Sequence, residues 1–230
     1  MKPYEPPPGA LALSLANETV ALLPERALWW PREQALFVAD VHLGKAASFR
    51  ALGQPVPSGT TRDNLERLSS LVDALGARSL VVLGDFLHAA TAQQAQVLDP
   101  VRAWRARHAA LRCVLVRGNH DSHAGDPPPE LRFDIVDEPW RIGPFAACHH
   151  PQSVQDAYVL AGHLHPAVQL RGRAYDSARL PCFCEAPAQL ILPAFGAFTG
   201  TTLALPAQTL CCYAVGDGTV TALPWSGRSG

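Results

Sequence analysis

Short apolar runs separated by amphipathic stretches dominate the first half of the chain. Three runs are continuous and rich in Val and Leu, as is typical of strands buried on both faces. They are residues 35–39, 80–83 and 113–116. Between them, residues 62–75 carry apolar side chains at intervals of three and four, and residues 92–111 are long enough for a second helix, which we expect Pro100 to interrupt. Alternating strands and helices predict parallel crossovers and therefore an α/β core.

Shorter, hairpin-like patterns flank this core. Residues 11–23 alternate around Asn17-Glu18, and residues 28–39 reverse at a turn that begins with Pro31, so we expect two hairpins. In the last third we expect short strands in a second, largely antiparallel sheet packed on the first, with a hairpin turn at Asp217-Gly218. These strands are residues 145–148, 158–161, 190–192, 203–205 and 211–215.

The composition excludes a disordered chain and a purely electrostatic binder. Of 230 residues, 48% are apolar, which is enough for a large core, and the net charge of −1 would not hold nucleic acid by itself. The start of the sequence lacks a secretory leader and no apolar run has membrane-spanning length, so we expect a cytoplasmic protein without membrane contact. We expect one domain over residues 1–230, with a proline-rich segment at 1–10 and a flexible tail at 223–230.

The cysteines predict no further chemistry. Six cysteines are too few for a disulfide framework. Cys182 and Cys184 lack a second pair at the spacing of a zinc finger, so we expect buried thiols rather than a zinc site.

Side chains that bind metals stand where the predicted buried strands end. Five motifs occur in chain order: Asp40-x-His42, Gly84-Asp85, Gly118-Asn119-His120-Asp121, His149-His150-Pro151 and Gly162-His163-x-His165. In a layered α/β protein the carboxyl ends of the strands lie along one edge, where ligands bind. We therefore expect these residues, although far apart in the sequence, to face a common cleft.

The donor types indicate the class of metal centre. The oxygen donors are Asp40, Asp85 and Asn119, and the imidazoles are His42, His149, His163 and His165. Seven donors without a thiolate exceed what one tetrahedral zinc needs and suit two divalent cations about 3.5–4 Å apart, with Asp85 as the bridge. The mixed oxygen and nitrogen donors favour Mn²⁺, with Fe, Ni, Co or Zn as alternatives.

Such a centre predicts hydrolysis of phosphate esters. A hydroxide held between two cations is a nucleophile for attack on phosphorus, and the cations neutralise charge on the phosphoryl oxygens. His120, next to Asn119, is placed to protonate the leaving oxygen, with Asp121 or another carboxylate holding the imidazolium. The loop motifs of nucleotide triphosphatases and serine hydrolases do not occur in the sequence.

Together the motifs resemble the signature of the calcineurin-like metallophosphoesterases. This resemblance implies a four-layer αββα sandwich, with two packed mixed sheets flanked by helices, and a dinuclear metal centre. More narrowly, several segments are similar to the bacterial ligase-associated DNA damage response endonucleases. They are residues 40–45, 49–50, 55–60, 180–182, 192–196 and 198–200.

The resemblance also implies roles for the site residues. One metal would be held by Asp40, His42, Asp85 and His165, and the other by Asp85, Asn119, His149 and His163, with His120 as the acid. We prefer His149 to His150 as the ligand because it directly follows the apolar run. The resemblance further implies a DNA substrate and a functional association with a DNA ligase, a helicase and an exonuclease.

Residues outside the motifs are candidates for substrate contact. Lys45 and Arg50, just beyond the first motif, are candidates for binding phosphate, and His123 lies close to the Asn119 loop. The basic stretch at residues 102–112 either contacts a nucleic acid backbone or is a solvated face. His88 lies in no motif and receives no role.

We therefore expect a metal-dependent phosphodiesterase, with a DNA endonuclease as the preferred form. A cyclic-nucleotide or small-molecule phosphoesterase would use the same centre inside a lidded pocket, whereas a nucleic acid strand needs an open groove. A non-catalytic scaffold with the same fold would tolerate loss of ligands, but all seven donors and His120 are present.

Overall fold

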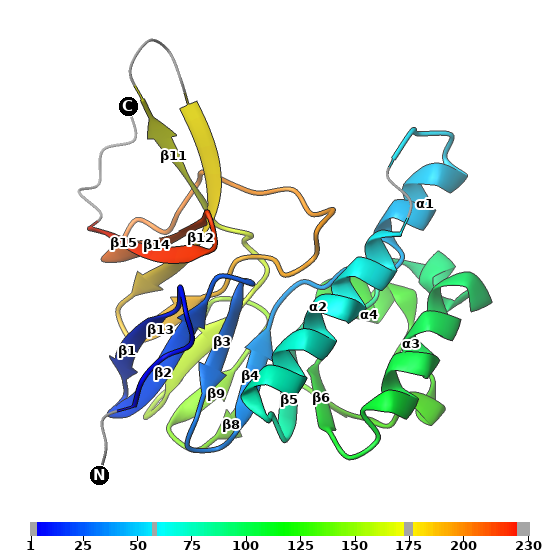
Figure 1. Ribbon diagram of the computed structural model, residues 1–230, viewed down its shortest axis with the longest axis horizontal. Coiled ribbons are helices and arrows are strands. Elements are labelled where there is room, and N and C mark those ends of the chain that lie inside the picture. The colour runs from blue at the N-terminus through cyan, green and yellow to red at the C-terminus, as the bar shows by residue number, and fades with distance from the viewer. Residues whose placement is uncertain (1–3, 57–58, 173–176, 225–230) are drawn as a thin grey trace.

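The first sheet has seven strands in sequence order (Figure 1). The computed structural model describes residues 4–56, 59–172 and 177–224. The strands are β1 (Leu11–Leu15), β2 (Glu18–Leu23), β3 (Ala27–Trp30), β4 (Ala35–Val38), β5 (Ser79–Leu83), β6 (Arg112–Val116) and β7 (Phe133–Val136). Strands β1 to β4 form an antiparallel meander, and β4 to β7 are parallel. The two hairpins and the parallel core expected from the sequence are confirmed.

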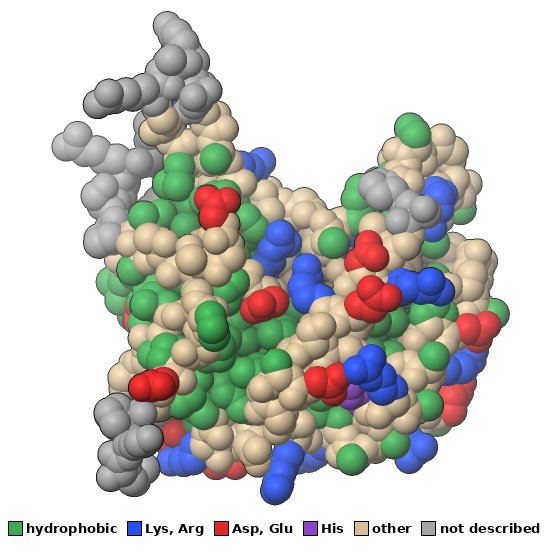
Figure 2. All heavy atoms as spheres, viewed as in Figure 1, with side chains coloured by type: hydrophobic (Ala, Val, Ile, Leu, Met, Phe, Trp, Pro, Cys, Tyr) green, Lys and Arg blue, Asp and Glu red, His purple; other side chains and the backbone are tan. Residues whose placement is uncertain are grey.

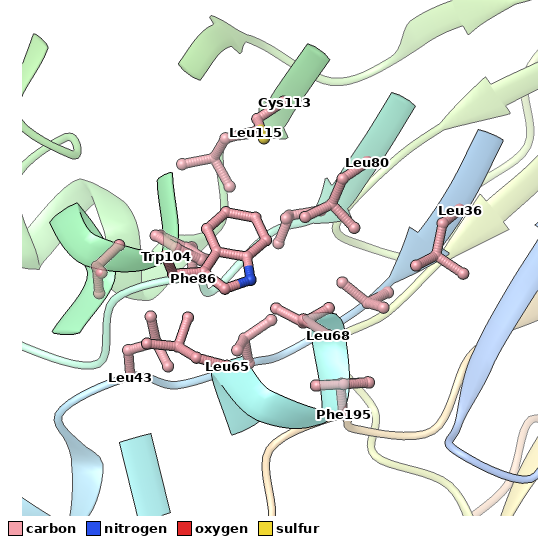
Figure 3. Packing of buried hydrophobic residues seen from close by; sticks show 14 of the residues in the cluster. Leu36, Leu43, Leu65, Leu68, Leu80, Phe86, Trp104, Cys113, Leu115 and Phe195 are labelled. Carbon is pink, nitrogen blue, oxygen red and sulfur yellow. The ribbon is translucent and has the colours of Figure 1, made fainter. Parts of the chain in front are cut away.

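Helices cover one face of this sheet. They are α1 (Lys45–Ala51), α2 (Thr60–Leu75), α3 (Ala95–Arg107) and α4 (Asn119–Ala124), with short 3₁₀ turns η1 (Ala90–Gln93) and η2 (Pro129–Leu131). In α2 the apolar stripe is buried, and the helix ends at Gly76, whose φ of 61° is left-handed. Figure 3 shows Leu68 of α2 and Trp104 of α3 packed against Leu36 and Leu80 of two adjacent strands. None of the helices in the described ranges combines the length and apolarity that crossing a membrane requires.

The expected break at Pro100 is wrong, because α3 continues through it. Proline removes one backbone hydrogen bond and crowds the preceding turn. Packing outweighs this cost, since Val97, Leu98, Val101 and Trp104 of the same helix are all buried.

The second sheet packs on the other face of the first. Its strands are β8 (Trp140–Ile142), β9 (Phe145–Ala147), β10 (Tyr158–Ala161), β11 (Ala167–Arg171), β12 (Ser177–Ala186), β13 (Gln189–Ile191), β14 (Cys211–Gly216) and β15 (Thr219–Pro224). Their order is β15-β14-β12-β13-β10-β9-β8, and β11 pairs with β12. The pairs of β10 with β9 and β13 are parallel, and the other pairs are antiparallel, so the sheet is mixed with an antiparallel majority.

Two details of this sheet differ from the sequence prediction. Residues 203–205 form no strand; the chain there makes only an isolated bridge between Thr202 and Pro166, and Leu203 is 40% exposed. The predicted tail begins too early, because Leu223 and Pro224 pair with Cys212 and Cys211 in the β14–β15 hairpin. The rest of that tail, from residue 225, lies outside the described residues.

Side chains that alternate between the two faces of the first sheet form two hydrophobic cores, one under the helices and one between the sheets. Val81 and Leu83 of β5 face the second sheet, whereas Leu80 and Val82 face the helices. The two packed mixed sheets expected from the sequence are confirmed. Among the described residues, the helices lie on the first sheet, and loop residues such as Val154 and Leu205 pack on the outer face of the second. All six cysteines are free thiols, and five of them are buried.

Candidate metal centre

The two sheets deliver the five motifs to one place. Asp40 and His42 follow β4, Asp85 follows β5, and Asn119 is the third residue after β6. From the second sheet, His149 follows β9, and His163 and His165 follow β10. Strands β4, β5 and β6 run parallel, so their carboxyl ends share an edge of the first sheet, and the carboxyl ends of the parallel strands β9 and β10 share an edge of the second. The structure therefore brings all seven predicted donors into two adjoining groups.

The first group consists of Asp40, His42, His165 and one oxygen of Asp85. Its distances are 3.3 Å from His165 Nε2 to Asp40 Oδ1 and 3.8 Å from His42 Nε2 to Asp85 Oδ2. The ligand atoms of Asp40, His42 and His165 lie within 4.8 Å of one another.

The second group surrounds His149 Nε2. This nitrogen lies 2.8 Å from Asn119 Oδ1, 3.1 Å from His163 Nδ1 and 3.5 Å from Asp85 Oδ1. The two oxygens of Asp85 thus face different groups, which is the arrangement that a bridging carboxylate needs.

The donor atoms fit divalent cations. Among the described residues, Asp40 Oδ1 and His42 Nε2 are buried and lack a hydrogen-bond partner, which is costly unless a cation satisfies them. The Nδ1 atoms of His149 and His165 donate to the carbonyls of Leu83 at 3.1 Å and Gly200 at 3.1 Å, which leaves each Nε2 with a free lone pair. Burial, with the charge of Lys45 second, lowers the pKa of His42, so its imidazole is neutral, the form that binds metals.

The backbone is strained at these residues. Five predicted ligands have left-handed φ values although they are not glycine. The values are 53° for Asp40, 48° for His42, 52° for Asp85, 69° for His163 and 49° for His165. Each such residue costs on the order of 1 kcal/mol, and such strain gathers at functional sites.

Two glycines leave room for the ligands. A Cβ atom on Gly84 would overlap the imidazole of His149, and one on Gly118 would overlap the carboxylate of Asp85. The glycines of the Gly84-Asp85 and Gly118-Asn119 motifs are therefore steric requirements of the site.

The structure corrects the expected partner of His120. Asp121 is fully buried and accepts hydrogen bonds from the N–H groups of Leu87 and Gly118, both at 3.0 Å. Burial, partly opposed by these bonds, raises the pKa of Asp121 to about 6. The ring of His120 instead donates from Nδ1 to the carbonyl of His88 at 2.8 Å. Asp121 shapes the loop, and His88 is a residue of the site that the sequence interpretation missed.

His149 and His150 occupy different environments. His149 is fully buried inside the second group, whereas the His150 side chain is 44% exposed and donates from Nδ1 to Glu138 at 2.7 Å. Glu138 also accepts the backbone N–H groups of both histidines. Burial raises the pKa of Glu138, but these hydrogen bonds outweigh it, and the net pKa is lowered. Glu138 thus anchors the segment that carries His149.

The three residues predicted to contact substrate lie in different places relative to the candidate centre. Lys45 begins α1 next to the centre; burial lowers its pKa, and the charges of Asp40 and Asp85 oppose this. Arg50 lies at the end of α1 and lines a separate cavity of about 200 Å³. His123 is exposed and turns back to donate from Nδ1 to Asn119 O at 2.6 Å.

The arginines of the basic stretch at residues 102–112 form ion pairs and hydrogen bonds within the protein. Arg102 pairs with Asp99 and Glu130, and Arg112 pairs with Asp134. Arg105 is buried and donates to two carbonyl oxygens. These contacts favour a structural role for the stretch over contact with nucleic acid.

Comparison with known proteins identifies the family of the chain. The family model of the calcineurin-like phosphoesterases matches residues 34–165. The crystal structure of the Pseudomonas putida nuclease MPE has 43% sequence identity and a TM-score of 0.82, over 93% of this chain and 100% of the other. A search of the curated proteins found no match.

Two further solved structures are only distantly similar. The phosphoesterase Yfce from E. coli has 17% identity and a TM-score of 0.41, over 83% of this chain and 98% of the other. The protein AQ665 from Aquifex aeolicus has 18% identity and a TM-score of 0.40, over 57% of this chain and 78% of the other. The family match and the 43% identity lead to one conclusion: this chain belongs to the calcineurin-like phosphoesterase family.

Proposed function

We propose that the protein is a metal-dependent phosphodiesterase with a dinuclear centre and that it cuts DNA as an endonuclease. The observation that carries the proposal is the division of the donors into two groups that share Asp85, one oxygen facing each group. Two divalent cations, when bound, polarise the phosphoryl group and lower the pKa of water. Mn²⁺ is the preferred metal because oxygen and imidazole donors are mixed.

The remaining steps belong to side chains. His120 donates a hydrogen bond from Nδ1 to the His88 carbonyl, so its Nε2 is available to donate a proton to the leaving oxygen. Lys45, half-buried beside Asp40 and Asp85, adds positive charge where a phosphate would bind. We also propose substrate contacts for Arg50 and His123 on sequence grounds alone.

The surroundings of the centre favour a polymeric substrate. Helix α1 begins three residues after His42, and β11 begins two residues after His165. Figure 1 shows both elements projecting from the molecule. Figure 2 shows the molecule hollowed between these two projections. An open notch suits a strand of nucleic acid better than a cyclic nucleotide, which needs an enclosing pocket.

The similarity to the Pseudomonas putida nuclease supports a nucleic acid substrate. A role in DNA repair beside a ligase, a helicase and an exonuclease rests on the resemblance of the sequence segments.

The test is a turnover assay with Mn²⁺ on single-stranded, nicked and supercoiled DNA, a cyclic nucleotide and a phosphomonoester. We expect turnover of DNA that Asp85→Asn abolishes and that Asp99→Asn, a change of an exposed carboxylate on α3, leaves intact. Turnover of the monoester without any of DNA would overturn the endonuclease proposal. Equal background rates for the wild type and Asp85→Asn on every substrate would overturn the proposal that the protein is an enzyme.

A further inference from the structure

His88 lies between a predicted ligand and the predicted acid. Its position comes from backbone pairing that continues past the ends of β4 and β5. Leu43 N–H donates to Phe86 O at 2.9 Å, and His88 N–H donates to Leu43 O at 3.1 Å. This extension carries residue 88 alongside His42.

The side chain of His88 contacts His42 through nitrogen. The two Nδ1 atoms are 3.3 Å apart, so one of them must carry a proton for the other to accept. His42 Nε2 is buried without a hydrogen-bond partner among the described residues and faces Asp85. This leaves Nε2 as the metal-binding atom of His42, so its proton lies on Nδ1 and is donated to His88. Histidine ligands of metals nearly always use their second nitrogen in this way.

The same residue holds His120 by two other contacts. The backbone carbonyl of His88 accepts the Nδ1 proton of His120 at 2.8 Å. The rings of His88 and His120 also stack, with centroids 4.8 Å apart and planes inclined by 22°.

We propose that His88 is a positioning residue that sets the proton positions of both neighbours. Its imidazole keeps the proton of His42 on Nδ1, so that His42 binds metal through Nε2. Its ring and its backbone carbonyl hold His120 so that Nε2 of His120 points away from His88. The inference rests on the proposed function, because it assumes that His42 is a ligand. The competing possibility is that His88 itself binds metal, since ligand atoms of His42, His88 and His120 lie within 4.8 Å of one another.

Two variants separate these roles. His88→Asn places an amide oxygen near the position of Nδ1 and can still accept the proton of His42. His88→Phe keeps a ring that stacks on His120 but has no acceptor. Calorimetric titration of the metal-free proteins with Mn²⁺ gives the dissociation constants, and thermal unfolding without metal reports on the fold.

We expect His88→Phe to raise the Mn²⁺ dissociation constant about 10- to 100-fold, the usual effect of losing such a hydrogen bond. We expect His88→Asn to bind Mn²⁺ nearly as the wild type does. If His88→Phe does not fold, His88→Leu takes its place.

Two outcomes would overturn the inference: wild-type Mn²⁺ affinity in His88→Phe, or an equal loss of affinity in His88→Asn. Failure of the proposed function is seen separately, because the wild type itself would then bind no Mn²⁺ or hydrolyse no phosphodiester.

Discussion

Space and hydrogen bonds around single residues decide whether the candidate metal centre can form. Gly118 has a φ of −96°, so its importance is steric and not conformational. A Cβ atom there would meet Asp85 Oδ1 and the Asp85 backbone nitrogen, and neither can move without displacing the Asp85 carboxylate.

The Gly118→Ala substitution should therefore weaken Mn²⁺ binding by about 10-fold or more, comparable with losing a support of the ligand shell. The matched control is Gly200→Ala, because a Cβ atom on Gly200 meets nothing within 4 Å. Calorimetric titration with Mn²⁺ measures both. Equal affinity in the two variants would show that Asp85 tolerates the displacement.

His120→Ala should slow hydrolysis most for leaving groups that must be protonated as they depart. For an alkyl leaving group, as in DNA, we expect a loss of about 10²- to 10⁴-fold in kcat, because no other group in the proposed mechanism donates the proton. For a nitrophenyl leaving group, which departs without protonation, the loss should be much smaller. Equal losses on both substrates would argue that His120 does not act as an acid.

Between the residue and the whole fold, α2 and α3 form the layer that covers the first sheet. Ser69 of α2 contacts His108, at the end of α3, with 2.9 Å between Oγ and Nε2. Burial lowers the pKa of His108, although the charge of Asp73 opposes this. The folded protein therefore binds a proton at His108 less readily than the unfolded chain does.

The lowered pKa of His108 determines how the free energy of unfolding changes with pH. The contribution of neutral His108 to stability is complete above the unfolded pKa of about 6.5 and is lost progressively as the pH falls below it. His108→Gln removes the titration, so its free energy of unfolding should fall less steeply between pH 7 and pH 5 than that of the wild type. Urea unfolding at several pH values measures this, with His123→Gln as the exposed control. Identical slopes would contradict the assignment.

Pro100 supplies a second prediction for α3. Pro100→Ala restores a backbone donor in a helix whose neighbouring apolar side chains already pack, so we expect a gain in stability of about 1 kcal/mol or more. Pro129 is at the first turn of η2, where proline is tolerated, so Pro129→Ala serves as the control and should give no such gain. A lower melting temperature for Pro100→Ala would show that proline is needed at that turn.

For the whole molecule, the candidate metal centre draws its residues from both sheets. Asp40, His42, Asp85 and Asn119 come from the first sheet, and His149, His163 and His165 come from the second. Cations bound there would link the halves of the sandwich and stabilise only the folded chain.

Mn²⁺ at about 100 times its dissociation constant should therefore add about 2.7 kcal/mol to the free energy of unfolding of the wild type. Asp85→Asn should lose most of this gain, while Asp99→Asn keeps it. Thermal unfolding with and without Mn²⁺ makes the comparison, and an equal rise in Tm for Asp85→Asn would contradict a shared ligand.

The sequence predicted those parts of the fold that depend on local pattern. Continuous apolar runs marked β4, β5 and β6, and the polar residues at the ends of these runs marked the candidate ligands. Strand β12 was missed because Arg179 and Pro181 interrupt its apolar pattern, and its pairing with β11, β13 and β14 is set by distant segments.

The missed site residues have similar causes. His88 gains its place from pairing between residues 42–43 and 85–88, which no local pattern reveals. The adjacency of Asp121 to His120 suggested a contact, but the helix turns the carboxylate back to the N–H of Gly118.

The most direct test of the dinuclear centre is an anomalous difference map from crystals soaked in Mn²⁺. We expect two peaks about 3.5–4 Å apart, with one beside Asp40, His42 and His165, the other beside Asn119, His149 and His163, and Asp85 between them. A single peak, or peaks away from these side chains, would contradict it.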